Sequence, residues 1–204
     1  MILLQPTYFS PILLYVAVAN TDEIIFETED NFQKQTFRNR CYIYTSQGKH
    51  LLNVPVQHSK EIKQKTKDVK IDYKDDWHKQ HLKTLQTAYS SSPFYEFYIE
   101  DLLPVFEKKI PFLLDLNFLA HEIIMDALQL EIPSKKSTEY VKEPKILDLR
   151  NLAEDKPKIT YNLERYIQIF SESHGFIPNL SILDLLFMEG PNALNYLETQ
   201  KINF

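Results

Sequence analysis

The sequence predicts an α/β fold in which a strand–helix–strand core opens the chain and helices dominate the C-terminal half. Short apolar runs alternate with one helical pattern in the first third, whereas apolar residues recur at helical spacing from about residue 75 onward. The chain has only three glycines among its 204 residues, which leaves few positive-φ positions for a hairpin-rich all-β fold. We expect one domain over residues 1–204, with an α/β part over about residues 1–75 and a helical part over about residues 75–204.

The first elements form the strand–helix–strand unit. Residues 2–4 are an apolar run that predicts a strand, and residues 23–27 predict a second one. Between them, Ser10 is suited to cap a helix and Pro11 to occupy its first position, so we expect a helix to about residue 20. A helix of this length can connect two parallel strands.

A hairpin and a polar connection follow. Residues 40–45 and 49–56 flank Ser46-Gln47-Gly48 and predict two antiparallel strands. Residues 58–74 are polar and rich in lysine. We expect this segment to be a solvated connection, with a mobile loop over a site as the alternative.

The remainder of the chain is expected to be mainly helical. Apolar side chains share one helical face over residues 75–89, and residues 115–130 form the clearest amphipathic helix. Pro104 should break or kink a helix over residues 95–108. Residues 132–150 are typical of a loop that ends in a short apolar run. The last predicted helices span residues 163–173, 180–188 and 192–199.

Composition and charge exclude several classes of function. The net charge of −5 and the pI of 5.7 argue against a dedicated nucleic-acid-binding protein. GxGxxG and GxxxxGK[ST] phosphate loops are absent, and one cysteine, Cys41, permits neither an internal disulfide nor a cysteine-based zinc cluster. The first residues lack the basic start of a signal peptide, and no apolar run is long enough to span a membrane. A cytoplasmic protein is therefore expected.

Candidate binding residues lie where the first two predicted strands end. Gln5 and Tyr8 follow the first strand, at the edge where open α/β sheets bind ligands, and Asp30 follows the second strand. Arg38 and Arg40, two of only four arginines, flank Asn39 just before the hairpin and are suited to bidentate recognition of a phosphate or carboxylate.

Each group has a structural alternative. Gln5 and Tyr8 can belong to a rigid turn whose aromatic residues pack in the core. Asp30 and Arg38 can form a surface ion-pair cluster.

Two further candidates lie in predicted helices. His78 and His81 share a helical face, but two histidines at this spacing are weak evidence for a metal, and we predict no metal ligands. Trp77 is suited to anchor the packing, and His81 to face either the core or a substrate. Asp184 lies among leucines, so its carboxylate must be paired or have a shifted pKa, unless it lies on the wet edge of its helix.

Several segments match a known family in the expected order and cover most of the chain. They are Gln5-Pro6-Thr7-Tyr8-Phe9-Ser10-Pro11, Phe37-Arg38-Asn39-Arg40, Asn53-Val54-Pro55-Val56, Trp77 with His81, and residues 178–187 with Gly190-Pro191. By these segments the chain resembles the WbqC-like proteins. The resemblance implies a cytoplasmic bacterial protein of O-antigen or other surface-polysaccharide biosynthesis. It also implies a glycine or aminoacyl transferase that uses an activated donor such as a nucleotide-sugar.

A weaker similarity concerns architecture alone. The strand, QPxYFxP turn, helix and second strand are similar to the start of Rossmann-like nucleotidylyltransferase folds. Phe9-Ser10-Pro11-Ile12 stands where those enzymes carry an HxGH motif, and the segment Ser134-Lys135-Lys136-Ser137-Thr138 is only loosely similar to their second phosphate motif.

We therefore consider three functions. The favoured one is a transferase with an activated phosphate-bearing donor and with His81 or Asp184 as general base. The residues expected to bind its substrates are Gln5, Tyr8, Asp30, Arg38, Asn39, Arg40 and Trp77. The alternatives are a nucleotidylyltransferase-like nucleotide-binding enzyme and a non-catalytic binding or scaffold protein. The sequence identifies neither a cofactor nor the oligomeric state.

Overall fold

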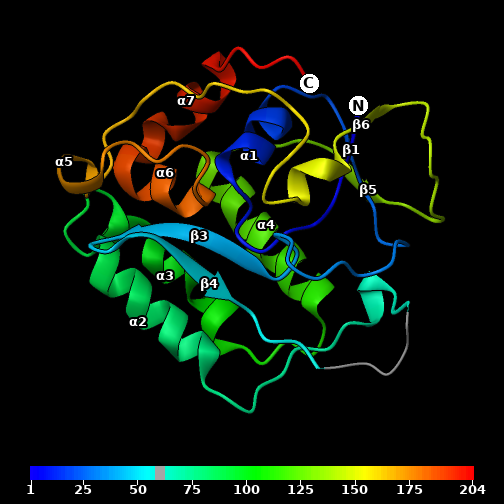
Figure 1. The fold of residues 1–204 in the computed structure, drawn as a ribbon, viewed down its shortest axis with the longest axis horizontal. Helices are drawn as coiled ribbons and strands as arrows, with labels where there is room; N and C mark the ends of the chain where they lie inside the picture. The colour runs from blue at the N-terminus through cyan, green and yellow to red at the C-terminus, as the bar shows by residue number, and fades with distance from the viewer. Residues whose placement is uncertain (58–62) are drawn as a thin grey trace.

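The computed structural model describes residues 1–57 and 63–204 and confirms the predicted α/β class (Figure 1). Its parallel sheet contains the strands β1 (Ile2–Leu4), β2 (Ile24–Phe26), β5 (Ser134–Lys136) and β6 (Leu147–Asp148). The order across the sheet is β5-β2-β1-β6. Helix α1 (Ile12–Ala19) connects β1 to its parallel neighbour β2, as the sequence predicts. The sheet thus draws strands from both sides of the boundary expected near residue 75.

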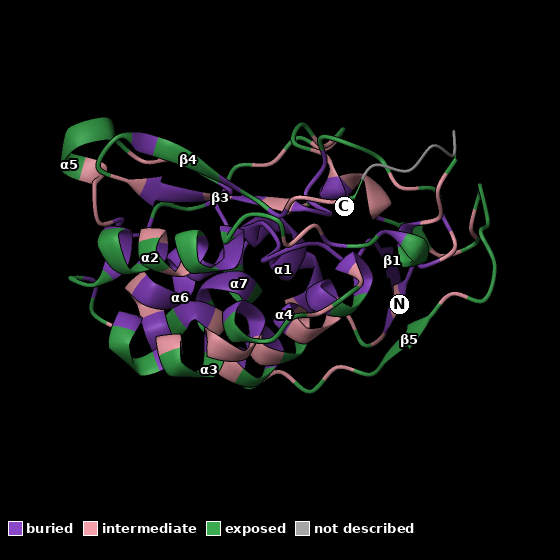
Figure 2. Cartoon of the chain, turned by 90° about the horizontal axis from the view of Figure 1, so that it is seen from below, coloured by how far each residue is buried: buried purple, intermediate pink, exposed green. Residues whose placement is uncertain are grey.

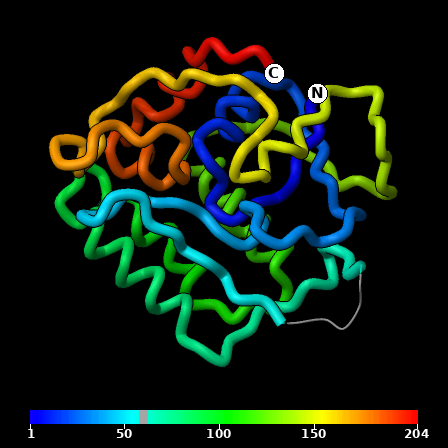
Figure 3. The backbone as a smooth tube through the Cα atoms, viewed as in Figure 1, coloured from blue at the N-terminus to red at the C-terminus, as the bar shows by residue number. Residues whose placement is uncertain are grey.

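The order of the strands determines where the sheet can bind a ligand. In chain order the strands lie third, second, first, fourth, which is the arrangement of the first four strands of the Rossmann fold. The winding direction reverses between the first and fourth strands, here β1 and β6. Residues 137–146, which join β5 to β6, contain no helix and form a wide excursion at one edge of the molecule (Figure 3). The Rossmann-like character itself stays a prediction.

The predicted hairpin is present. Strand β3 (Arg40–Thr45) pairs antiparallel with β4 (Gly48–Asn53), and Thr45 lies opposite Gly48. The second strand therefore ends three residues earlier than residue 56, the predicted end. Figure 2 shows the hairpin as a layer above the helices, with buried residues where the two layers meet.

The remaining regular elements are helices. The α-helices are α2 (Trp77–Tyr89), α3 (Tyr95–Glu107), α4 (Leu113–Leu128), α5 (Ser171–His174), α6 (Ile182–Glu189) and α7 (Ala193–Thr199). The 3-10 turns are η1 (Thr66–Asp68), η2 (Arg150–Ala153) and η3 (Gly190–Asn192). Helix α1 is apolar on all sides, and its residues from Ile12 to Val18 are buried, so it lies in the core.

One prediction about helices is wrong in part and another is wrong. Helix α3 continues through Pro104, so the predicted break is absent, because buried Leu102, Val105 and Phe106 hold its last turn against the core, whereas the predicted kink stays a prediction. Residues 163–173 are not a helix apart from the start of α5. Hydrogen bonds between its backbone and distant side chains hold this segment in place; for example, the Glu164 N–H donates to Gln200 Oε1 at 2.9 Å.

The start of α1 and the loop after α4 also differ from the prediction. Pro11 occupies the N-cap position of α1, and Ser10 does not cap the helix. The predicted loop over residues 132–150 contains β5 and β6, two strands too short to show a periodic pattern.

Part of the predicted polar connection cannot be compared. Of residues 58–74, residues 58–62 lie outside the described residues, and the rest contains η1 and the buried side chains of Val69 and Ile71. In the described ranges, no helix is both long and apolar enough to cross a membrane.

Gly190 is expected to resist substitution more than Gly175. Gly190 has φ +52°, and a Cβ there would lie 2.5 Å from the Phe94 ring, whereas Gly175 has φ +75° and open space around its Cα. Gly190→Ala should therefore lower the free energy of unfolding by about 2–4 kcal/mol, through backbone strain and overpacking together. Gly175→Ala should show the strain alone. Urea unfolding of both variants measures the difference, and equal losses would contradict the packing argument.

Candidate functional site

A cavity of about 500 Å³ opens at the carboxyl ends of β1, β2 and β6. Gln5 follows β1, Glu29 and Asp30 follow β2, and Asp148 and Arg150 come from the end of β6 and the residues after it. Parallel strands bring their carboxyl ends to one edge, and ligands bind there where the winding reverses. The cavity thus lies at the edge of the sheet that the strand order favours.

A buried carboxylate organises the floor of the cavity. Asp30 is 5% exposed, and its Oδ2 accepts hydrogen bonds from Gln5 Nε2 at 2.9 Å and from Arg38 Nη2 at 2.7 Å. Its Oδ1 accepts from Thr66 Oγ1 at 2.6 Å. Arg38 also donates to Thr36 Oγ1 at 3.2 Å. The sequence-predicted residues Gln5, Asp30 and Arg38 therefore meet in one cluster, which we call the Asp30 cluster.

Two atoms of the Asp30 cluster are left without a bond. Gln5 Oε1 and Arg38 Nε are buried and have no hydrogen-bond partner among the residues that the structure describes. Buried polar atoms are nearly always paired in folded proteins, with protein groups, water or a ligand. Gln5 therefore keeps one unused acceptor and Arg38 one unused donor inside the buried cluster.

A second charged cluster forms the wall on the β6 side. Arg150 donates to both carboxylate oxygens of Asp148, at 2.9 and 2.6 Å, and to buried Glu27 at 3.3 Å. Its guanidinium lies 5.1 Å from the centre of the Tyr140 ring. Partial burial acts to raise the pKa of Asp148, but the hydrogen bonds from Arg150 outweigh it and hold that pKa below its ordinary value. These contacts fix Arg150 and compensate its charge.

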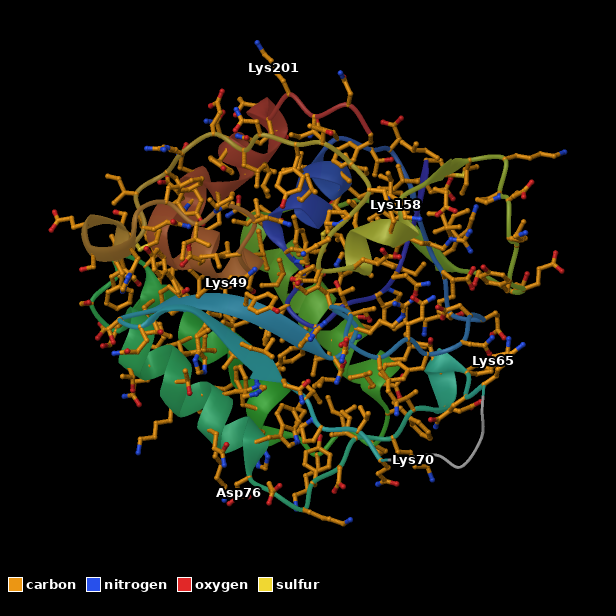
Figure 4. All side chains as sticks on the ribbon, viewed as in Figure 1. Lys49, Lys65, Lys70, Asp76, Lys158 and Lys201 are labelled. Atoms are coloured by element: carbon orange, nitrogen blue, oxygen red, sulfur yellow. The ribbon has the colours of Figure 1, made fainter. Side chains whose placement is uncertain are left out.

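The charges of Lys65 and Glu154 are less compensated by ion pairs than those of Arg38 and Arg150. The Lys65 ammonium donates to the carbonyl of Glu29, a neutral group, while the Glu29 carboxylate pairs with Lys67 at 2.8 Å. Figure 4 labels Lys65 at the margin of the molecule beside η1. Glu154 lines the cavity and forms no ion pair in the described part of the chain. Within the same part, no group of three or more His, Cys, Asp or Glu residues is arranged to hold a metal ion.

Asn39 and Arg40 follow the Asp30 cluster in sequence but lie outside the cavity. Asn39 Nδ2 donates to Asn53 Oδ1 at 3.2 Å and to the Val54 carbonyl at 2.9 Å, which ties the two arms of the hairpin together. Arg40 donates to the carbonyl of Gln35. Arg38 and Arg40 therefore do not act on one ligand in this arrangement.

Tyr8, Trp77 and His81 form a separate aromatic group beneath the hairpin. Tyr8 Oη lies 3.0 Å from His81 Nδ1, and the Trp77 ring lies 5.1 Å from the His81 ring, edge to face. Burial lowers the pKa of His81 to about 4, so its imidazole is neutral at pH 7. These three residues occupy the core rather than the lining of the cavity.

Asp184 is fully buried in α6 and joins three elements. Its oxygens accept hydrogen bonds from Tyr89 Oη at 2.6 Å, Tyr166 Oη at 2.5 Å and Gln168 Nε2 at 3.1 Å. Burial raises the pKa of Asp184, although these three donors act to lower it. The interpretation that Asp184 lies on the wet edge of its helix is wrong, because the polar partners come from α2 and the segment before α5.

A model of the WbqC-like protein family matches residues 5–155. This chain belongs to the WbqC-like protein family. The residues that line the cavity all lie inside the matched range, whereas Asp184 lies beyond it. The chain is also similar to the uncharacterized protein Rv1507c of Mycobacterium tuberculosis. The two are 29% identical over 207 residues, which cover 88% of this chain and 89% of Rv1507c. No solved structure matches the chain.

Sequence reasoning missed several residues of this WbqC-like cavity. They include Lys65, Asp148, Arg150 and Glu154. Sequence reasoning also missed Glu27, which accepts a hydrogen bond from Arg150 without lining the cavity. One signal was present for Arg150, because it is one of the four arginines and directly follows the apolar run at residues 146–149. If that run is taken as a strand, Asp148 and Arg150 fall at the carboxyl edge of the sheet.

Proposed function

We propose that this WbqC-like protein is a group transferase and that its cavity binds an activated, phosphate-bearing donor. The observation that carries the proposal is the cavity at the carboxyl ends of β1, β2 and β6, with Arg38, Lys65 and Arg150 in its lining. Its volume of about 500 Å³ suits a small molecule, and its polar groups are held by rigid elements. These features support a binding site for a polar metabolite.

Lys65 is the best candidate to hold the phosphate. Arg38 is neutralised by Asp30, and Arg150 is shared between Asp148 and Glu27. Lys65 contacts only a carbonyl oxygen in the described chain, so its charge is the least compensated of the three cations. An ammonium group of this kind binds phosphate as a point charge.

Glu154 is the best candidate for the general base. Transfer to an amine or hydroxyl requires a group that accepts the proton as the new bond forms and the phosphate-bearing group leaves. Glu154 lines the cavity, whereas His81 and Asp184 lie in the core. The catalytic roles of His81 and Asp184 stay predictions, and the proposal does not depend on them.

Membership in the WbqC-like family supports a proposal about the transferred group and the process that the reaction belongs to. We propose that the transferred group is glycyl or a related aminoacyl group and that the reaction belongs to the cytoplasmic assembly of a surface polysaccharide of the O-antigen type. The donor then carries the aminoacyl group on a phosphate, as an aminoacyl nucleotide does, and the phosphate leaves as the acceptor amine or hydroxyl bonds to the acyl carbon. A nucleotide-sugar would take the part of the acceptor.

A thermal-shift screen tests the binding step. The purified protein is heated with ATP, CTP, UDP-sugars, coenzyme A or glycine, with and without Mg²⁺. A ligand at about 100 times its Kd adds ~2.7 kcal/mol, which raises Tm by several degrees in a chain of this size. Lys65→Met is expected to abolish the shift, because it removes the phosphate anchor. Lys79→Met is the control, since Lys79 is an exposed lysine that pairs with Asp76 and does not line the cavity.

A turnover assay tests the transfer step with the ligand that the screen identifies. Glu154→Gln is expected to keep the thermal shift and to lose transfer at least about a hundredfold, as expected for a general base. A shift that persists in Lys65→Met would contradict the assigned anchor. If no phosphate-bearing ligand raises Tm, the transferase proposal fails, and the scaffold alternative becomes the better account.

A further inference from the structure

A groove of about 660 Å³ lies between α3, α4 and the start of α7, and it shares no lining residue with the cavity at the sheet edge. Figure 2 shows α3 at the lower margin of the molecule. Phe97 lines the groove and is 74% exposed, although phenylalanine is usually buried. The other apolar side chains of the groove are half-buried, namely Pro104, Ile123, Ala127 and Leu194. The groove thus offers apolar surface to a further molecule.

The two helices that form the groove carry charge of one sign. Helices α3 and α4 contain seven acidic residues and neither lysine nor arginine. Within the described part of the chain, none of the seven forms an ion pair. The imidazole of His121 on α4 is neutral at pH 7, because burial lowers its pKa to about 4. The seven residues are Glu96, Glu100, Asp101, Glu107, Asp115, Glu122 and Asp126.

Three of these carboxylates belong to the groove itself. Glu100, Asp101 and Asp126 line it, and all three are exposed. No lysine, arginine or histidine is among the lining residues that the structure describes. The groove therefore combines an apolar surface with uncompensated negative charge.

This charge selects among the possible occupants. Nucleic acids and anionic membrane surfaces carry charge of the same sign and would be repelled. A second copy of the chain that used the same face would place carboxylates opposite carboxylates, which is also unfavourable. A small cation would pair with the carboxylates but would leave Phe97 in water. A protein segment that carries both apolar and basic side chains complements the whole groove.

We propose that the groove binds a basic amphipathic helix of a partner protein. Such a helix lays apolar residues at positions i, i+3, i+4 and i+7 into a groove between helices. Here those residues would cover Phe97 and the half-buried apolar side chains, while lysines or arginines would face Glu100, Asp101 and Asp126. Charge complementarity of this kind favours the correct partner and speeds association. The inference does not depend on the proposed function, because the cavity and the groove have no residue in common.

Fluorescence anisotropy with two labelled peptides tests the inference on the full chain. Both peptides contain about 18 leucine and lysine residues in the same numbers. One places all leucines on a single helical face, and the other distributes them around the helix. We expect the first peptide to bind at least about tenfold more tightly than the second, because only the first can cover the apolar surface while its lysines face the carboxylates.

Substitution of Phe97 tests the apolar contact. Phe97→Ser is expected to weaken binding of the amphipathic peptide at least about fivefold, and it should leave the fold intact because the side chain is exposed. Ile167→Ser is the matched control, since Ile167 is 76% exposed and does not line the groove. It should leave the affinity unchanged.

Reversal of charge tests the electrostatic contact. Asp101→Lys combined with Asp126→Lys is expected to weaken binding at least about tenfold, because two lysines of the peptide would face like charges. Glu143→Lys combined with Glu172→Lys alters the net charge equally at exposed positions outside the groove and should have little effect. Unchanged Tm values show that the variants are folded.

Three results would overturn the inference. The first is that neither peptide binds. The second is equal affinity for the two peptides, which would show attraction by charge alone. The third is that the groove variants bind as tightly as their controls, which would place the peptide elsewhere. None of these results alters the outcome of the thermal-shift screen, so the proposed function stands or fails separately.

Discussion

Arg38→Met is expected to lower the free energy of unfolding by about 3–5 kcal/mol. The substitution leaves the carboxylate of Asp30 buried without its cation, and removal of one partner from a buried ion pair has this magnitude of effect. Thr66 and Gln5 still donate to Asp30, but neither carries a charge. Chemical unfolding in urea, monitored by circular dichroism at pH 7.5, measures the loss.

Two further variants separate the charge from the packing of Arg38. Arg38→Met combined with Asp30→Asn removes both charges and keeps an oxygen acceptor, so most of the stability should return. Arg165→Met, at an exposed arginine, should change stability by no more than about 0.5 kcal/mol. If the double variant is as unstable as Arg38→Met, the loss comes from packing, and the argument from buried charge is wrong.

The protein is expected to lose about 4 kcal/mol of stability between pH 7.5 and pH 5 from two histidines, buried His81 and partly buried His121. Burial lowers the pKa of His81 and of His121 to about 4, from an ordinary value of 6.5. Below pH 6.5 the unfolded chain therefore binds two protons that the folded chain does not. Stability is complete above pH 6.5 and falls as the pH decreases toward 4, by about 2 kcal/mol per histidine at pH 5.

A variant of His121 and a control at an exposed histidine test this pH dependence. His121 stacks on Tyr15 and contacts Phe26 edge to face, so His121→Phe preserves an aromatic ring that cannot be protonated. Its urea midpoint should fall by about half as much as that of the unmodified protein between pH 7.5 and pH 5. His174→Gln, at an exposed histidine of α5, should keep the full pH dependence. A midpoint that stays constant down to pH 5 would show that both histidines are protonated in the fold at little cost.

The parts of the site that could be predicted lie close to local sequence signals. The apolar runs of β1 and β2, with a helix of crossover length between them, place Gln5 and Asp30 at one edge of a parallel sheet. Arg38 stood out because arginine is rare in this chain. The structure brings these three residues into contact through Asp30, which no local pattern specifies.

The parts that could not be predicted depend on contacts between distant segments. Strand β5 has three exposed residues and β6 has two, so neither shows an alternating pattern, and their pairing with β2 and β1 determines their conformation. Lys65 reaches the cavity through a bridge between its backbone and Asn31. Asp184 was a candidate because it is a carboxylate among leucines. Its hydrogen-bond partners Tyr89 and Tyr166 lie on other segments, and these bonds make it part of the core.

Mapping of ligand-induced shifts in the backbone amides tests the central claim, that the cavity at the carboxyl ends of β1, β2 and β6 is the binding site. ¹H–¹⁵N spectra are recorded as the best phosphate-bearing ligand of the thermal screen is added. The account predicts the largest shifts at Gln5, Asp30, Lys65 and Arg150, with Lys65→Met removing them. If the largest shifts instead lie at Trp77 and His81, or around Asp184, the claim is contradicted and the ligand binds in the region of the core.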